Sequence, residues 1–152
     1  ADRPRGTSVA ELAEQLGATA SVDPNAGDLI AAITSADGLL PGGADVVIEC
    51  AGVTETVEQS VRLARSGGTV VILGVMPQGV KVEFEPFDIL FRELRILGSF
   101  INPDTHARAA AMVASSVIKV EPLISRTISL KDAPQAIANP PLPGEVRVLV
   151  VP

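Results

Sequence analysis

Three apolar runs in the sequence each end in unusually small residues. The endings are "ECAG" (49–52), "LGV" (73–75) and "GSF" (98–100). Small residues let a main chain approach a flat ligand closely. In an open sheet of parallel strands, ligands bind outside the carboxyl ends of the strands. These endings therefore predict a ligand site at one edge of a sheet.

Few side chains could do chemistry of their own. Cys50 could be a nucleophile, but free cysteines are usually buried and no base stands beside it, so we expect a packing role. Glu49 is expected to make local hydrogen bonds at its strand end. His106, the only histidine, is expected on the surface. One cysteine and one histidine cannot form a structural zinc site, which takes about four ligands. An acidic surface at a turn accounts for Glu83, Glu85 and Asp88.

The composition indicates a globular chain with an aliphatic core. Hydrophobic residues make up 47% of the 152 residues, while aromatic residues make up only 3%. Buried parallel sheets favour this mixture. The net charge of −6 argues against nucleic acid or an anionic membrane as a partner. No apolar run approaches the roughly 20 residues that span a bilayer, and no secretory signal is visible. We therefore expect a soluble, cytoplasmic protein.

The elements that must position the three endings alternate between helix and strand. Such alternation predicts right-handed crossovers and a parallel, doubly wound α/β sheet. Ser8 is a predicted helix cap and Gly17 a predicted helix stop. Another helix should begin at Thr54 or Glu55 and end at Gly67-Gly68. Further helices are expected within 26–35, 86–94, 103–116 and 131–139, the third of them starting near Asn102 or Asp104. Strands are expected at 18–22, 44–49, 69–75, 95–100, 123–130 and 146–151. Residues 80–84 form a short alternating segment.

An ordered series of segments resembles the C-terminal, cofactor-binding half of the zinc-dependent medium-chain dehydrogenase/reductase superfamily. The polyol (sorbitol-type) and threonine dehydrogenase branch is the most similar. The matching segments are "ELAEQLGATASVDP" (11–24), "GADVVIECAG" (43–52), "ARSGGTVVILGV" (64–75), "FRELRILGSF" (91–100) and "VEPLISRTISLKDAPQAI" (120–137). The resemblance implies a partial Rossmann sheet that lacks its first strands. It also implies two parts: 1–100, a partial dinucleotide-binding domain, and 101–152, a segment that returns to the catalytic domain.

The resemblance implies a cofactor site at the strand ends. Asp2 corresponds to the acidic residue that binds the adenosine ribose, which favours NAD. Arg3 and Arg5 lie close by in the sequence. An arrangement that binds the additional phosphate of NADP therefore stays open. The residues implied to contact the nicotinamide end are Ala51, Gly52, Leu73, Gly74, Val75, Ser99, Phe100 and Ile101.

The features that the family places upstream of residue 1 are absent from the sequence. There is no GxGxxG loop, and the zinc ligands and proton relay of the family belong to its N-terminal domain. The sequence therefore reads as a fragment entered part-way through a protein. Zinc is expected only in that missing domain, and the chain alone is expected to be inactive. The missing first strands would leave a gap in the sheet, so the chain alone should be unstable or should associate.

The implied activity is hydride transfer between a secondary alcohol, such as a polyol, and the nicotinamide of NAD or NADP. Family analogy also implies a homo-oligomer that pairs through the edge strand 95–100. Three alternatives stay open. The chain could be a truncated, non-catalytic nucleotide-binding module, or part of a zinc-independent quinone reductase of the same superfamily. "GGTVVILG" (67–74) is also similar to methyltransferases, for which an antiparallel final strand would be expected.

Overall fold

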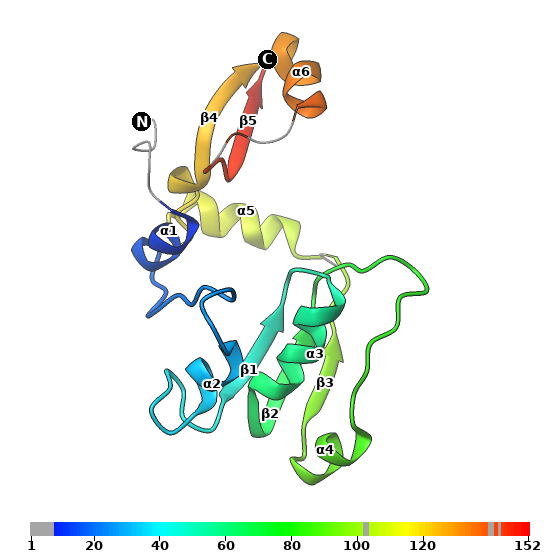
Figure 1. Ribbon diagram of the computed structural model, residues 1–152. Helices are drawn as coiled ribbons and strands as arrows, with labels where there is room; N and C mark the ends of the chain where they lie inside the picture. The colour runs from blue at the N-terminus through cyan, green and yellow to red at the C-terminus, as the bar shows by residue number, and fades with distance from the viewer. Residues whose placement is uncertain (1–7, 102–103, 140–141, 143) are drawn as a thin grey trace. The chain divides into compact units, whose positions relative to one another are not determined.

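The computed structural model describes residues 8–101, 104–139, 142 and 144–152, which fall into two compact units. One unit comprises residues 23–103, and the other combines residues up to 22 with those from 104 onward (Figure 1). The predicted domain boundary at residue 100 stays a prediction.

The unit of residues 23–103 is built on a parallel three-stranded sheet. Its strands are β1 (Ala44–Glu49), β2 (Ala64–Ile72) and β3 (Arg95–Gly98), in the order β1-β2-β3. Its helices are α2 (Leu29–Thr34), α3 (Thr54–Leu63) and α4 (Pro86–Phe91). Glu49 is paired with Ile72, and Ile72 with Gly98. The three carboxyl ends therefore lie at the same edge of the sheet, as the sequence predicts.

Helix α3 covers one face of this sheet (Figure 1). Val57 of α3 and Val70 of β2 are completely buried there, together with Val61 and Ala64. All of these side chains are aliphatic, which agrees with the low aromatic content of the chain. Their burial is what fixes β1 and β2 against the helix.

The opposite face of the sheet is apolar but open. Val46 and Ile48 alternate with Val47 along β1 and are 54% and 59% exposed, and Leu97 on β3 is 53% exposed. Among the described residues, no strand pairs with the outer edge of β1. Parallel sheets are normally buried on both faces. This sheet therefore has the unpaired edge and uncovered apolar face that missing first strands predict.

The other unit holds a separate two-stranded sheet. Its helices are α1 (Val9–Gln15), α5 (His106–Ala114) and α6 (Ala133–Ala138), with short 3-10 turns η1 (Glu121–Leu123) and η2 (Leu130–Asp132). Strands β4 (Ile124–Ser129) and β5 (Arg147–Val151) run parallel. Arg126 of β4 forms an ion pair with Glu145, and the Ser125 hydroxyl accepts a hydrogen bond from the Val146 N–H at 2.8 Å. These contacts fix the start of β5 beside β4.

The helix boundary signals in the sequence are largely confirmed. Ser8 forms a capping box with Glu11 at the start of α1, and Gly17 follows the helix with a φ of +110°. Helix α3 begins at Thr54 as predicted, but it ends at Leu63, before Gly67-Gly68, because β2 already starts at Ala64. Thr105 is the N-cap of α5, whereas Asn102 lies outside the described residues.

The strand predicted at 18–22 does not form, and the alternating segment at 80–84 is not a strand either. Both segments alternate or carry β-branched residues, yet neither pairs as a β-strand. A strand forms only where a neighbour accepts its main-chain hydrogen bonds, and no described strand pairs with either segment. Strand pairing is parallel throughout the described residues, so the antiparallel final strand expected for a methyltransferase is not found there. Within the described ranges, no helix has both the length and the apolar character needed to cross a bilayer.

Candidate functional site

The three strand ends continue to hydrogen-bond to one another beyond the sheet. The N–H groups of Leu73 and Gly74 both donate to the Glu49 main-chain carbonyl at 2.9 Å, and the Ser99 N–H donates to the Ile72 carbonyl at 2.9 Å. The segments that follow the strands are therefore held in a fixed order at one edge. This edge is the place where the sequence predicts a ligand site.

Glu49 is the most constrained side chain at this edge. It is 4% exposed, although it is a carboxylate. Its Oε1 accepts hydrogen bonds from the N–H groups of Ala51 and Gly52, both at 2.8 Å, and from the Thr56 hydroxyl at 2.7 Å. Its Oε2 is buried and has no hydrogen-bond partner among the described residues. The local hydrogen-bonding role predicted for Glu49 is thus confirmed.

Two opposing effects determine the pKa of Glu49. Burial raises it, because the charged form loses solvation. The Thr56 hydroxyl and the main-chain N–H groups of Gly52, Ala51 and Gly74 lower it, because they favour the charged form. Their combined effect outweighs burial and holds the pKa below its ordinary value, so Glu49 is a buried anion at neutral pH.

The two glycines of the edge are required by contact between the loops themselves. Gly52 has a φ of +69°, and a Cβ at this position would lie 2.8 Å from the main-chain N and O of Val75. A Cβ on Gly74 would lie 2.3 Å from the Gly52 nitrogen and 2.5 Å from Glu49 Oε2. Contacts within the chain therefore require these residues to be small. From the sequence alone, their small size is attributed to the close approach of a ligand.

The surface of this edge is formed by exposed, mainly apolar side chains. Val75 is 75% exposed, Phe100 74% and Ile101 62%. Ile101 has a φ of +52°, which is unusual for a β-branched residue and fixes a sharp turn after β3. Such a surface can hold a flat, largely apolar ring. The other members of the exposed set are Ala51, Leu73 and Ser99.

The packing role expected for Cys50 is wrong. Its side chain is exposed, and its Sγ lies 3.9 Å from the Ile48 carbonyl. The buried inward position at this strand end belongs to Glu49, and since side chains alternate along a strand, Cys50 points the other way. His106 is exposed, as predicted.

Several predicted site residues cannot be placed. Asp2, Arg3 and Arg5 lie outside the described residues. Across the described ranges there is no group of three or more His, Cys, Asp or Glu side chains that could hold a metal ion. The described residues therefore do not fit a zinc site.

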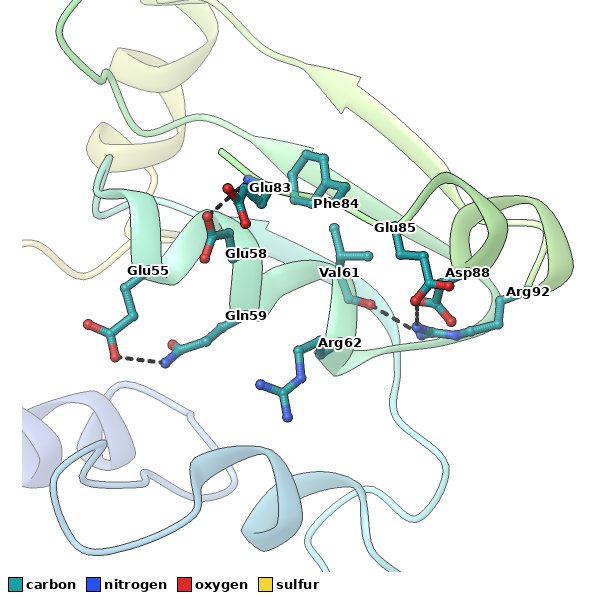
Figure 2. A pocket seen from close by; sticks show the side chains of 10 residues that line it. All are labelled: Glu55, Glu58, Gln59, Val61, Arg62, Glu83, Phe84, Glu85, Asp88 and Arg92. Atoms are coloured by element: carbon teal, nitrogen blue, oxygen red, sulfur yellow. Dashed lines mark hydrogen bonds and ion pairs between the residues drawn. The ribbon is translucent and has the colours of Figure 1, made fainter. Parts of the chain in front are cut away.

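A hollow lies between α3 and residues 83–92, away from the strand ends (Figure 2). It has a volume of about 760 Å³. Glu58 Oε1 accepts a hydrogen bond from the Glu83 N–H at 3.0 Å, and Arg92 pairs with Asp88 at 2.7 Å. The sequence predicts an acidic surface here but gives no signal for the hollow, because the hollow forms between two segments that are distant in sequence. The Glu83–Glu58 bond and a bond from Arg92 to the Val61 carbonyl join the two segments to each other.

Known proteins resemble this chain both in sequence and in structure. Residues 5–116 match the profile of a family described as zinc-binding dehydrogenase. A crystal structure of a protein from Sinorhizobium meliloti 1021, described as a zinc-binding dehydrogenase bound to NADP, is 66% identical and superposes with a TM-score of 0.91. The alignment covers 94% of this chain and 42% of that protein.

Two curated relatives are sugar-alcohol dehydrogenases. D-arabinitol dehydrogenase 1 of Uromyces fabae is 31% identical over 64% of this chain and 28% of its own length. Sorbitol dehydrogenase of Gallus gallus is 27% identical over 92% of this chain and 39% of its own length. The chain thus spans between about a quarter and two fifths of the length of these relatives.

Proposed function

Because the chain belongs to the zinc-binding dehydrogenase family, we propose that it forms the nicotinamide end of the cofactor site in an alcohol or polyol dehydrogenase. The complete enzyme would move hydride between a secondary alcohol and the nicotinamide of NAD or NADP. The observation that carries this proposal is the convergence of three parallel strand ends at one edge, where ligands of such sheets bind. The relatives that act on D-arabinitol and sorbitol support a polyol as the alcohol.

Each part of the edge has a distinct role in this proposal. Ala51, Leu73 and Val75 pack against the nicotinamide ring, and their side chains are exposed for this contact. The main chain after β3, at Ser99, Phe100 and Ile101, binds the ring's carboxamide. Gly52 and Gly74 hold the two loops in contact beneath the ring. The cofactor supplies the hydride chemistry, while these residues bind it, orient it and exclude water.

NADP is the cofactor to test first. The Sinorhizobium meliloti neighbour, at 66% identity, is bound to NADP. Arg3 and Arg5 could bind the additional phosphate of NADP, whereas Asp2 would favour NAD. We therefore propose that both cofactors are accepted and that NADP is preferred.

We assign no residue of this chain to zinc. The described residues offer no suitable group of ligands, and no step of the reaction is attributed to them beyond cofactor binding. We also propose that the complete enzyme is a homo-oligomer. The outer edge of β3 is unpaired among the described residues, so a second copy could pair with it.

A chimera tests the proposal directly. In this chimera, the 94% of the chain that aligns replaces the matched 42% of the Sinorhizobium meliloti neighbour. We expect the purified chimera to bind NADP and to reduce it with at least one sugar alcohol when zinc is supplied. The unmodified neighbour is the matched control. A folded chimera that binds neither NADP nor NAD, beside a neighbour that does, would overturn the proposal.

A further inference from the structure

We propose that Glu49 is a positioning residue that locks the loop after β1 to the loop after β2, and so fixes the surface on which the nicotinamide rests. The inference builds on the proposed function, because it names the group that holds the proposed surface in place. Glu49 does not contact the cofactor in this proposal. It acts through Ala51 at the end of β1, and through Leu73 and Gly74 at the end of β2.

The contacts of Glu49 reach both loops and the helix between them. Its side-chain Oε1 accepts the Ala51 and Gly52 N–H groups, which fixes the loop after β1. Its main-chain carbonyl accepts the Leu73 and Gly74 N–H groups, which fixes the loop after β2. The Thr56 hydroxyl adds a bond from the first turn of α3. The side chain of Glu49 therefore ties the loop after β1 to α3, while its main-chain carbonyl, which a substitution keeps, holds the loop after β2.

The carboxylate of Glu49 is buried and closely packed against the loop after β2. The side chain is 4% exposed, and the space beside Oε2 is so tight that a Cβ on Gly74 would lie 2.5 Å from it. Oε2 also has no hydrogen-bond partner among the described residues. A buried polar atom without a partner is costly. The presence of this unpaired oxygen is explained if the site needs the loop geometry that the hydrogen bonds to Oε1 impose.

The carboxylate cannot be replaced by its amide without conflict. Glutamine has the same shape as glutamate, but its NH₂ group would take the place of one carboxylate oxygen. That group would either face the Ala51 and Gly52 N–H groups or take the buried position of Oε2, where no hydrogen-bond partner is found among the described residues. Glu49→Gln should therefore shift the loops while preserving the volume of the side chain.

The chimera provides the test, with two ligands as probes. NADP occupies the whole cofactor site, whereas 2′,5′-ADP occupies only the adenosine half. We expect Glu49→Gln to weaken NADP binding by roughly tenfold, as for the loss of a buried hydrogen bond to a charged group, and to leave 2′,5′-ADP binding unchanged. A role limited to general stability would weaken both ligands or neither.

Thr56 provides an independent variant in case Glu49→Gln does not fold. Thr56→Val removes the hydroxyl that bonds Oε1, and we expect it to weaken NADP binding by a few-fold. Thr56→Ser restores the hydroxyl and should recover most of that loss. Folded Glu49→Gln or Thr56→Val variants with the affinity of the unmodified chimera for NADP would overturn the inference. If the unmodified chimera binds no NADP, the proposed function fails instead.

Discussion

Gly74 lies where two loops and a buried carboxylate meet. A side chain there would collide with the Gly52 nitrogen and Glu49 Oε2. Gly74→Ala should therefore destabilise the chimera by roughly 1–3 kcal/mol, the usual cost of overpacking. Gly98→Ala is the matched control, because a Cβ at Gly98 meets nothing within 4 Å. Thermal unfolding of both variants measures the difference, and equal stabilities would contradict the described packing.

The lowered pKa of Glu49 gives a pH dependence with a definite sign. Because the folded-state pKa lies below the ordinary value of 4.5, the ionised carboxylate stabilises the fold above that pH. This contribution is lost as the pH falls below 4.5 and through the folded-state pKa. The melting temperature of the chimera should exceed that of Glu49→Gln at neutral pH, and the gap should narrow in acid. A gap that widens in acid would contradict this assignment.

Glu145 does not affect the difference in melting temperature between the chimera and its Glu49→Gln variant. The Arg126 hydrogen bond and the Leu142 N–H hold the pKa of Glu145 below its ordinary value as well. Its contribution is present in both proteins and cancels in the difference between them.

At the scale of elements, Arg92 stabilises the end of α3. Its guanidinium donates to the main-chain carbonyls of Val61, at 3.2 Å, and Ala64, and it pairs with Asp88. These carbonyls have no partner within the helix, and a cation at a helix C-terminus is favourable. Arg92→Ala should cost about 1–2 kcal/mol of unfolding free energy.

Arg62 is the control for this prediction. It lies on the same helix, is exposed and lines the same hollow, but it is not a donor to the carbonyls that end α3 (Figure 2). Arg62→Ala should change stability by less than about 0.5 kcal/mol. If Arg92→Ala and Arg62→Ala lose the same unfolding free energy in denaturant, the contact of Arg92 with the helix end does not stabilise the fold.

Sequence patterns predict those elements whose formation is decided locally. The Ser8 cap, the start of α3 and the apolar runs of β1 to β3 are all visible in the sequence because local caps and burial determine them. Residues 18–22 have a strand-like sequence but form no strand, because pairing depends on a neighbour that the sequence of the segment cannot show. The pairing of the Gly52 and Gly74 loops is likewise a tertiary contact, so sequence analysis locates the site but not the reason for its glycines.

At the scale of the whole molecule, the open apolar face of the β1-β2-β3 sheet is the dominant feature. Val46, Ile48 and Leu97 are each more than half exposed on it, and exposed apolar patches of this kind promote association. We expect the 152-residue chain by itself to form oligomers or to unfold without a cooperative transition. Sedimentation and thermal unfolding of the isolated chain check this. A cooperative transition from a purified monomer would contradict it.

The central claim is that the nicotinamide rests on the edge formed by the ends of β1, β2 and β3. Its most direct test is the affinity of the Ala51→Leu chimera for NADP and for 2′,5′-ADP, because Ala51 is exposed at this edge and a larger side chain would occupy the place of the ring. Ala36→Leu, at another exposed alanine of the same unit, is the control. We predict that Ala51→Leu weakens NADP binding by about tenfold or more, equivalent to at least 1.4 kcal/mol, without changing 2′,5′-ADP binding. Unchanged affinity of a folded Ala51→Leu chimera for NADP would contradict the account.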